Sequence, residues 1–100
     1  MEQTNTNVTI KLKNDVEVKA TLTYRRLYQL QQREPKLYEQ YVKAQSQDTP
    51  SELDILLIIY VGYKCAENEA EYSFEEFMDL FPDNRVVLQS TFVQLVYPKN

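Results

Sequence analysis

The sequence contains no histidine, no tryptophan, one glycine and one cysteine among its 100 residues. Without histidine, the chain lacks the side chain that most often acts as a general acid or base and as a metal ligand. A single glycine cannot build a glycine-rich phosphate loop, and a single cysteine cannot close an internal disulfide. These absences predict a protein that is not an enzyme and that needs no metal and no cofactor.

The reactive side chains that remain have ordinary structural interpretations. Cys65 has no histidine partner and lies on an apolar side of a predicted helix, so we expect a buried structural thiol rather than a nucleophile. Glu67, Glu69 and Glu71 stand at alternate positions after that helix. This arrangement is more typical of a solvated surface than of a metal site or an acid–base pair.

Composition favours one folded domain that spans residues 1–100. The chain is 43% hydrophobic and 26% charged, which is sufficient for a core. Its formal net charge is -4 with both signs interspersed, so the sequence predicts no nucleic-acid-binding surface. The polar start MEQTNTN lacks the apolar segment of a secretory signal, and together with the single thiol it indicates a reducing cytoplasm.

The most apolar stretch, SELDILLIIYVGYKCA at residues 51–66, predicts the element around which the fold is built. Its length and its flanks indicate a helix from about Pro50 to Asn68 rather than a strand. Thr49 is a helix-capping residue type, Pro50 suits the first turn, and Glu52 completes a capping box. The apolar run is less than half as long as the ~20 residues that a membrane span requires.

Both sides of this helix are apolar, which predicts burial all round with other elements on both sides. At ~100° per residue, one side holds Leu56, Ile59, Tyr60 and Tyr63, and the nearly opposite side holds Ile58, Val61 and Cys65. Gly62 lies within the helix, where glycine is roughly 1 kcal/mol less favourable than alanine. We therefore expect a neighbouring element to approach closely at Gly62.

Strict alternation of apolar and polar residues between Asn7 and Leu22 predicts a two-stranded hairpin. The apolar positions are all even-numbered, and directly opposed residues share a face, so paired positions must sum to an even number. A three-residue loop at 13–15 meets this condition, with Asn14 or Asp15 left-handed; a two-residue turn with a bulge would also meet it. The expected pairs are Leu12 with Val16, Ile10 with Val18, and Val8 with Ala20.

Helical patterns occupy most of the remaining chain. Thr23 caps a predicted helix from Tyr24 to about Arg33, with Tyr24 and Tyr28 on its inner side. Pro35 separates it from a second helix at about 36–45.

Two more helices follow the central one. Ser73 and Glu76 form a capping box for a short helix, and Asp83 caps the last helix, which runs from Asn84 to about Val96 with Thr91 facing away from the core. The fold class is therefore α+β: an N-terminal two-stranded antiparallel hairpin followed by a bundle of about four to five helices, mainly helical.

Tyrosine is the abundant aromatic residue, with eight copies in the chain. Its apolar ring and polar hydroxyl suit protein interfaces, although a tyrosine can equally lie at the core edge with its hydroxyl in water. Four tyrosines at helix positions are predicted near the surface: Tyr28, Tyr38, Tyr41 and Tyr97.

The chain resembles the tail assembly chaperones of long-tailed, siphovirus-type phages and prophages of Gram-positive bacteria. The resemblance runs from Val8 to Val96 and rests on the order of a hairpin (VTIKLKNDVEVKATLTY), a helix (RRLYQLQQRE), a central helix ending IIYVGYKCAENE, a short SFEEFMDLF helix and an apolar last helix. The most similar motifs lie at 57–63 and 72–77. The hairpin turn departs from many relatives, because it reads Asn14-Asp15 where they have Asn-Gly or Gly-Lys.

The resemblance implies a non-enzymatic chaperone that binds the phage tape-measure protein and keeps it soluble until tail-tube subunits polymerise around it. It further implies homo-oligomers in the host cytoplasm, the tail-tube protein as a second partner, no role for nucleic acid or membrane, and absence from the mature virion. Relatives often have a longer, frameshifted form, so this chain would be the short form. A second hypothesis remains open, in which the chain is a small acidic adaptor or regulatory interaction protein from a phage or mobile element.

The implied partner is a long amphipathic helix, so its binding surface should be apolar and lined by helices. The central helix is predicted to be buried, which leaves the first two helices. We therefore predict that Tyr28, Tyr38 and Tyr41 contact either the partner or another copy of the chain.

Overall fold

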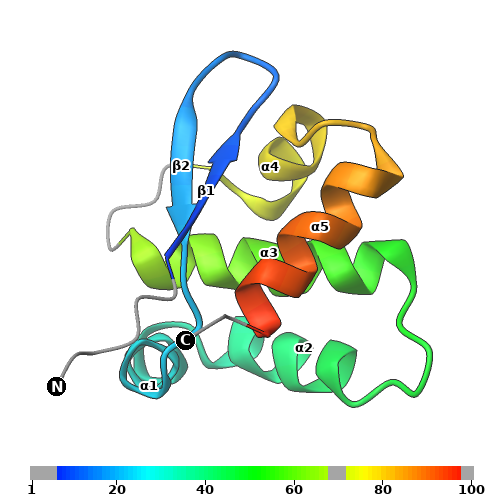
Figure 1. The fold of residues 1–100 in the computed structure, drawn as a ribbon. Coiled ribbons are helices and arrows are strands. Elements are labelled where there is room, and N and C mark those ends of the chain that lie inside the picture. Colours follow the sequence, from blue (N-terminus) through cyan, green and yellow to red (C-terminus); the bar gives the residue numbers. More distant parts are fainter. Residues whose placement is uncertain (1–6, 68–71, 98–100) are drawn as a thin grey trace, which may run out of the picture.

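The computed structural model describes residues 7–67 and 72–97 and shows a hairpin packed on a group of helices (Figure 1). The predicted α+β class is confirmed. In chain order the elements are β1 (Val8–Lys11), β2 (Glu17–Ala20), α1 (Tyr24–Arg33), α2 (Pro35–Gln45), α3 (Glu52–Ala66), α4 (Phe74–Leu80) and α5 (Arg85–Val96). No helix in the described part of the chain is long and apolar enough to cross a membrane.

The hairpin has the predicted register. The strands pair Val8 with Ala20 and Ile10 with Val18. Beyond them, the amide of Leu12 donates to the carbonyl of Val16 at 2.9 Å, and Asp15 takes the left-handed conformation with φ of 66°. The three-residue loop is therefore confirmed, although Val16 itself is exposed because it lies at the tip of the hairpin.

Two helices begin where the sequence predicts. The Thr23 hydroxyl accepts a hydrogen bond from the amide of Arg26 at 3.3 Å at the start of α1. At the start of α4, Ser73 accepts from the amide of Glu76 at 3.1 Å, and the Glu76 carboxylate accepts from the amide of Ser73 at 2.9 Å. Both caps are set by local sequence, since the residues that form them are three positions apart.

The prediction that Thr49 caps α3 is wrong, because the cap is Ser51. The Ser51 hydroxyl accepts from the amide of Asp54 at 3.0 Å, and the Asp54 carboxylate accepts from the amide of Ser51 at 3.1 Å. Thr49 and Ser51 both stand three residues before an acidic residue, so either could form a capping box. The later start leaves Glu52 free to form an ion pair with Arg85 of α5. The predicted end at Asn68 lies outside the described residues, and α3 ends at Ala66.

The cap of α5 is Asn84 rather than the predicted Asp83. The Asn84 side-chain oxygen accepts from the amides of Val86 and Val87. Asparagine and aspartate are equally good caps, and Asp83 is instead engaged by the Lys13 ammonium at 2.6 Å. The two adjacent candidates therefore have different partners, Asn84 within α5 and Asp83 in the hairpin.

Helix α3 lies between two apolar clusters, as its sequence predicts. The first cluster joins the hairpin, α4 and α5 to one side of α3, with Leu56, Ile59, Tyr60 and Tyr63 as members. The second cluster joins α1 and α2 to the other side, with Ile58, Val61 and Cys65 as members. In Figure 1 the hairpin and α4 lie above α3, α1 and α2 lie below it, and α5 crosses it in front.

Neighbouring elements approach α3 closely at Gly62. A Cβ atom on Gly62 would lie 3.0 Å from a methyl group of Leu95 and 3.1 Å from the Cβ of Ala20. The carbonyl of Gly62 also accepts a hydrogen bond from the amide of Thr21 at 3.0 Å. The predicted close approach is confirmed, and it comes from two elements, the end of β2 and α5.

Some predicted side-chain orientations are wrong. Tyr24 and Tyr28 are 91% and 59% exposed rather than on the inner side of α1, because α1 packs on the core through Leu27 and Leu30. The exposure of Tyr28 agrees with its predicted position near the surface. Thr91 is buried rather than outward-facing. Helix α5 contributes residues to both clusters.

Replacing Gly62 with valine should lower the free energy of unfolding by about 1–3 kcal/mol, because the added methyl groups would overlap Leu95 and Ala20. Helix propensity alone slightly favours valine over glycine. A loss of stability in the variant would therefore come from packing and not from propensity. Urea unfolding measures it, with Ala66→Val as a control at a half-buried position of the same helix. An equal loss in both variants would contradict the close-packing explanation.

Candidate protein-binding site

The predicted contact residues Tyr28, Tyr38 and Tyr41 occupy three different environments. Tyr28 is exposed, Tyr38 is half-buried, and Tyr41 is only 4% exposed. The rings of Tyr38 and Tyr41 are neighbours, with centroids 6.0 Å apart. The three tyrosines therefore do not form one continuous surface.

Tyr41 belongs to the second cluster rather than to the surface. Burial raises the pKa of its hydroxyl, and the nearby Cys65 and Tyr38 raise it further. The position follows from the packing of α2 on α3, which turns Tyr41 and Ala44 inward. The prediction that Tyr41 lies near the surface is wrong, although one side of the residue lines a cleft.

That cleft lies where α1, α2 and the end of α5 meet, and it has a volume of about 330 Å³. We call it the α1–α2–α5 cleft; its lining residues are Leu22, Thr23, Tyr24, Leu27, Tyr41, Gln45, Leu95 and Val96. Most of these side chains are apolar, and the highly exposed Tyr24 adjoins the nearly buried Tyr41. The arrangement suits an apolar side chain presented by a protein partner.

Sequence reasoning missed Tyr24 as a site residue, because its position at the start of α1 predicts an inward side chain. The one available signal was its spacing from Tyr28, since residues four apart lie on the same side of a helix. Leu22 and Val96 carry no such signal. They stand far apart in the chain, and only the packing around α3 brings them to one cleft.

A second cleft, of about 400 Å³, lies where the first turns of α3 and α5 meet α4. Its lining includes apolar residues such as Leu53 and Leu56, but also both members of the Glu52–Arg85 ion pair. The Lys13–Asp83 ion pair adds charge at the same end. This polar boundary makes the second cleft a poorer surface for an apolar helix than the α1–α2–α5 cleft.

The reactive side chains singled out in the sequence lie in ordinary surroundings in the structure. The described residues contain no group of three or more His, Cys, Asp or Glu side chains that could hold a metal ion. Cys65 is buried as predicted, and burial raises the pKa of its thiol to about 11, an increase that Arg33 and Arg26 offset only in part. Glu67 is exposed, whereas Glu69 and Glu71 lie outside the described residues.

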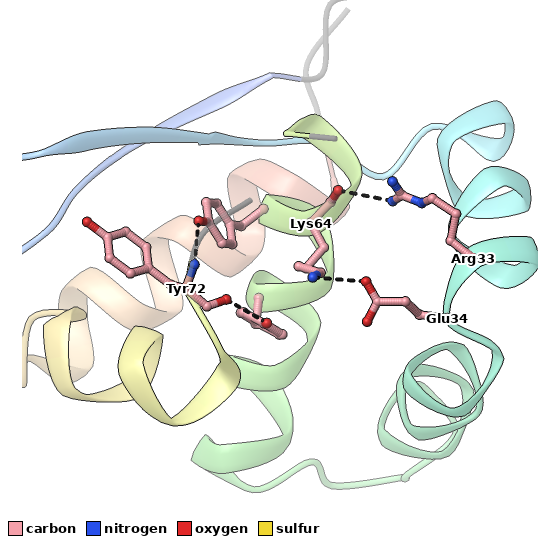
Figure 2. Close-up of polar contacts among 6 residues, drawn as sticks. Arg33, Glu34, Lys64 and Tyr72 are labelled. Carbon is pink, nitrogen blue, oxygen red and sulfur yellow. Dashed lines mark hydrogen bonds and ion pairs between the residues drawn. The ribbon is translucent and has the colours of Figure 1, made fainter. Parts of the chain in front are cut away.

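The carboxyl end of α3 is held by polar contacts from both sides (Figure 2). The Tyr60 hydroxyl donates to the carbonyl of Tyr72 at 2.8 Å, and the Tyr63 hydroxyl accepts from the amide of Tyr72 at 3.2 Å. On the side of α1, the Lys64 ammonium lies 2.9 Å from the Glu34 carboxylate. Buried tyrosines thus form hydrogen bonds within the fold, whereas other tyrosines lie on the surface.

Guanidinium groups of α1 bind the last carbonyls of α3. Arg26 donates to the carbonyl of Cys65 at 3.3 Å, and Arg33 donates to that of Lys64 at 3.5 Å. These carbonyls have no partner within the helix, and a cation near a helix carboxyl end is favourable. The contacts fix α1, and with it Tyr24, relative to the cleft.

Tyr60→Phe should change how stability depends on pH. Burial raises the pKa of Tyr60 to about 12, whereas an unfolded tyrosine titrates near ~10. The unfolded chain therefore loses this proton first, so stability is full below pH ~10 and falls by at most about 2–3 kcal/mol as pH rises towards ~12. The variant should lose about 1 kcal/mol at pH 7 through the missing hydrogen bond, but should decline less steeply above pH ~10.

Urea unfolding between pH 7 and alkaline pH tests this expectation, with Tyr24→Phe as the control because Tyr24 is exposed. Identical alkaline decline in wild type and Tyr60→Phe would show that Tyr60 is not the titrating group.

Comparison of the chain with models of known protein families, with curated proteins and with solved structures finds no match. We therefore infer function from the geometry of the described residues and from the order of elements along the chain.

Proposed function

We propose that this protein is a non-enzymatic phage tail assembly chaperone that binds the tape-measure protein and keeps it soluble during tail assembly. It would act in the host cytoplasm, leave the tail before the virion matures, and encounter the tail-tube protein as a second partner. The hairpin, α1, α3, α4 and α5 follow one another in the order on which the sequence resemblance rests, and α2 is an additional helix between α1 and α3.

The observation that carries the proposal is the α1–α2–α5 cleft. A tape-measure protein is expected to present long amphipathic helices, and such helices bind through apolar side chains at successive turns. The cleft offers an apolar recess of about 330 Å³ beside an exposed aromatic residue, Tyr24. One turn further along α1, the exposed Tyr28 extends this surface for a second contact.

Each tyrosine has a distinct part in the proposed contact. Tyr24 and Tyr28 would cover the partner helix with rings that remain accessible before binding. Tyr41 would form the wall of the recess and act through its fixed position. Tyr38 would support Tyr41 through the contact between their rings. This division retains the three predicted residues and adds Tyr24.

Charge supports the same role. The net charge of -4 favours solubility of the free chaperone. In the described residues, carboxylates form ion pairs with basic side chains in the hairpin, at the α1–α2 junction and at the start of α3. These carboxylates take part in contacts within the fold. The alternative, an acidic adaptor or regulator that mimics nucleic acid, requires carboxylates gathered on one surface.

Co-expression of the chain with the tape-measure protein of the same phage tests the proposal. Wild type should raise the soluble fraction of the tape-measure protein and co-purify with it. The double variant Tyr24→Ala/Tyr28→Ala should reduce the co-purified amount at least about tenfold, because aromatic hot-spot residues each contribute more than ~1 kcal/mol. Both side chains are exposed, so the thermal midpoint should stay within a few degrees of wild type.

The matched control is Gln29→Ala/Gln32→Ala, which alters two exposed side chains of the same helix. This control should bind as wild type does. If wild type neither dissolves nor binds the tape-measure protein, the chaperone proposal fails. Stoichiometric recovery of a host enzyme in its place would favour the adaptor or regulator.

A further inference from the structure

Charge is distributed unevenly between the layers of the fold. Helices α1 and α2, which lie below α3 in Figure 1, contain one acidic residue, Glu39, although the whole chain has a net charge of -4. Their basic residues are Arg25, Arg26, Arg33, Lys36 and Lys43. The layer formed by α1 and α2 is therefore basic within an acidic protein.

The basic side chains of this layer have no carboxylate partner within the described residues. Arg26 and Arg33 instead donate to the last carbonyls of α3, which leaves Arg25 as the arginine of α1 without a role in the fold. Four basic side chains in other parts of the structure each form an ion pair, and these are Lys11, Lys13, Lys64 and Arg85. Charge that is neutralised elsewhere is thus left open on α1 and α2.

Arg25 stands beside the proposed contact surface. It is exposed, it follows Tyr24 of the α1–α2–α5 cleft, and it adjoins Tyr28 on the helix surface because the two stand three residues apart. Its position in the first turn of α1 is unfavourable, since the amino end of a helix favours acidic residues. Helix stability therefore does not explain Arg25, whereas contact with an acidic partner does.

The cleft itself has no charged side chain in its lining. Its recess therefore suits an apolar side chain, and the charge that a partner meets comes from Arg25 next to it. Tyrosine and arginine are among the residues that most often dominate binding energy at protein interfaces. An apolar recess with a cation beside it complements an apolar side chain that has acidic neighbours.

We propose that the α1–α2–α5 cleft accepts an amphipathic helix whose apolar side is flanked by acidic residues, and that Arg25 selects this charge. The inference rests on the proposed function, because it assigns a charge to the segment of the tape-measure protein that binds there. An acidic residue three or four positions from the apolar anchor would lie one turn away on the partner helix. That position brings its carboxylate towards Arg25 when the anchor occupies the recess.

The net negative charge of the chain does not oppose this contact at physiological salt. The Debye length is then about 8 Å, so charges on the far side of α3 are largely screened. Helix α4, with Glu75, Glu76 and Asp79, lies on that far side (Figure 1). Charge close to the cleft, rather than the net charge, therefore governs binding.

Three synthetic peptides test the proposal on the purified chain. Each has about 20 residues, long enough to form a helix in water, with a leucine stripe flanked by glutamate, glutamine or lysine. Fluorescence anisotropy at about 0.15 M salt measures their affinities. The glutamate peptide should bind at least about tenfold more tightly than the lysine peptide, because several surface charge pairs change together. The glutamine peptide should be intermediate.

Arg25→Glu should weaken binding of the glutamate peptide at least about fivefold and leave the glutamine peptide within about twofold of wild type. An acidic residue in the first turn favours the helix, so the variant should fold. Lys19→Glu is the matched control. It makes the same change of charge at an exposed residue of β2, on the other side of α3, and should bind each peptide as wild type does.

Equal affinity for the glutamate and lysine peptides, or equal losses in Arg25→Glu and Lys19→Glu, would overturn the inference, as would failure of every peptide to bind. An oligonucleotide that binds as tightly as the glutamate peptide would also overturn it, because negative charge alone would then suffice. Co-purification of the tape-measure protein separates the two proposals. If that protein binds while the peptides are not discriminated, only the charge inference fails. If it does not bind while the glutamate peptide is preferred, only the chaperone proposal fails.

Discussion

Burial of α3 from both sides is the constraint on which the structure depends. A helix that is apolar all round must be covered all round, and the chain achieves this with the hairpin and α4 on one side and α1 and α2 on the other. Gly62 permits β2 and α5 to approach the helix within van der Waals contact. The positions of the α1–α2–α5 cleft and of the outer side of α5 are consequences of that packing.

Local chemistry explains which features were predictable from the sequence. The apolar residues of the hairpin all stand at even-numbered positions, which fixes the register of the two strands. The two apolar sides of α3 can be assigned from the sequence because helical periodicity is regular. Where two capping residues stand close together, as with Asp83 and Asn84, the local sequence alone does not distinguish them. The burial of Tyr41 and the exposure of Tyr24 were not predictable for the same reason: both depend on how α1 and α2 pack against α3, which short-range patterns do not specify.

The two sides of α5 have different surroundings. Leu95 and Val96 line the α1–α2–α5 cleft, whereas Val86 and Val93 face outward.

The most direct test of the central role of α3 compares Ile59→Ala, in the first cluster, with Val61→Ala, in the second. Both side chains are fully buried, so losses of about 2–5 and about 1–3 kcal/mol are expected. Urea unfolding is followed by circular dichroism and by tyrosine fluorescence. If α3 unites both clusters, each variant unfolds in one transition that the two probes report at the same urea concentration. Separate transitions, with one cluster surviving loss of the other, would contradict this account.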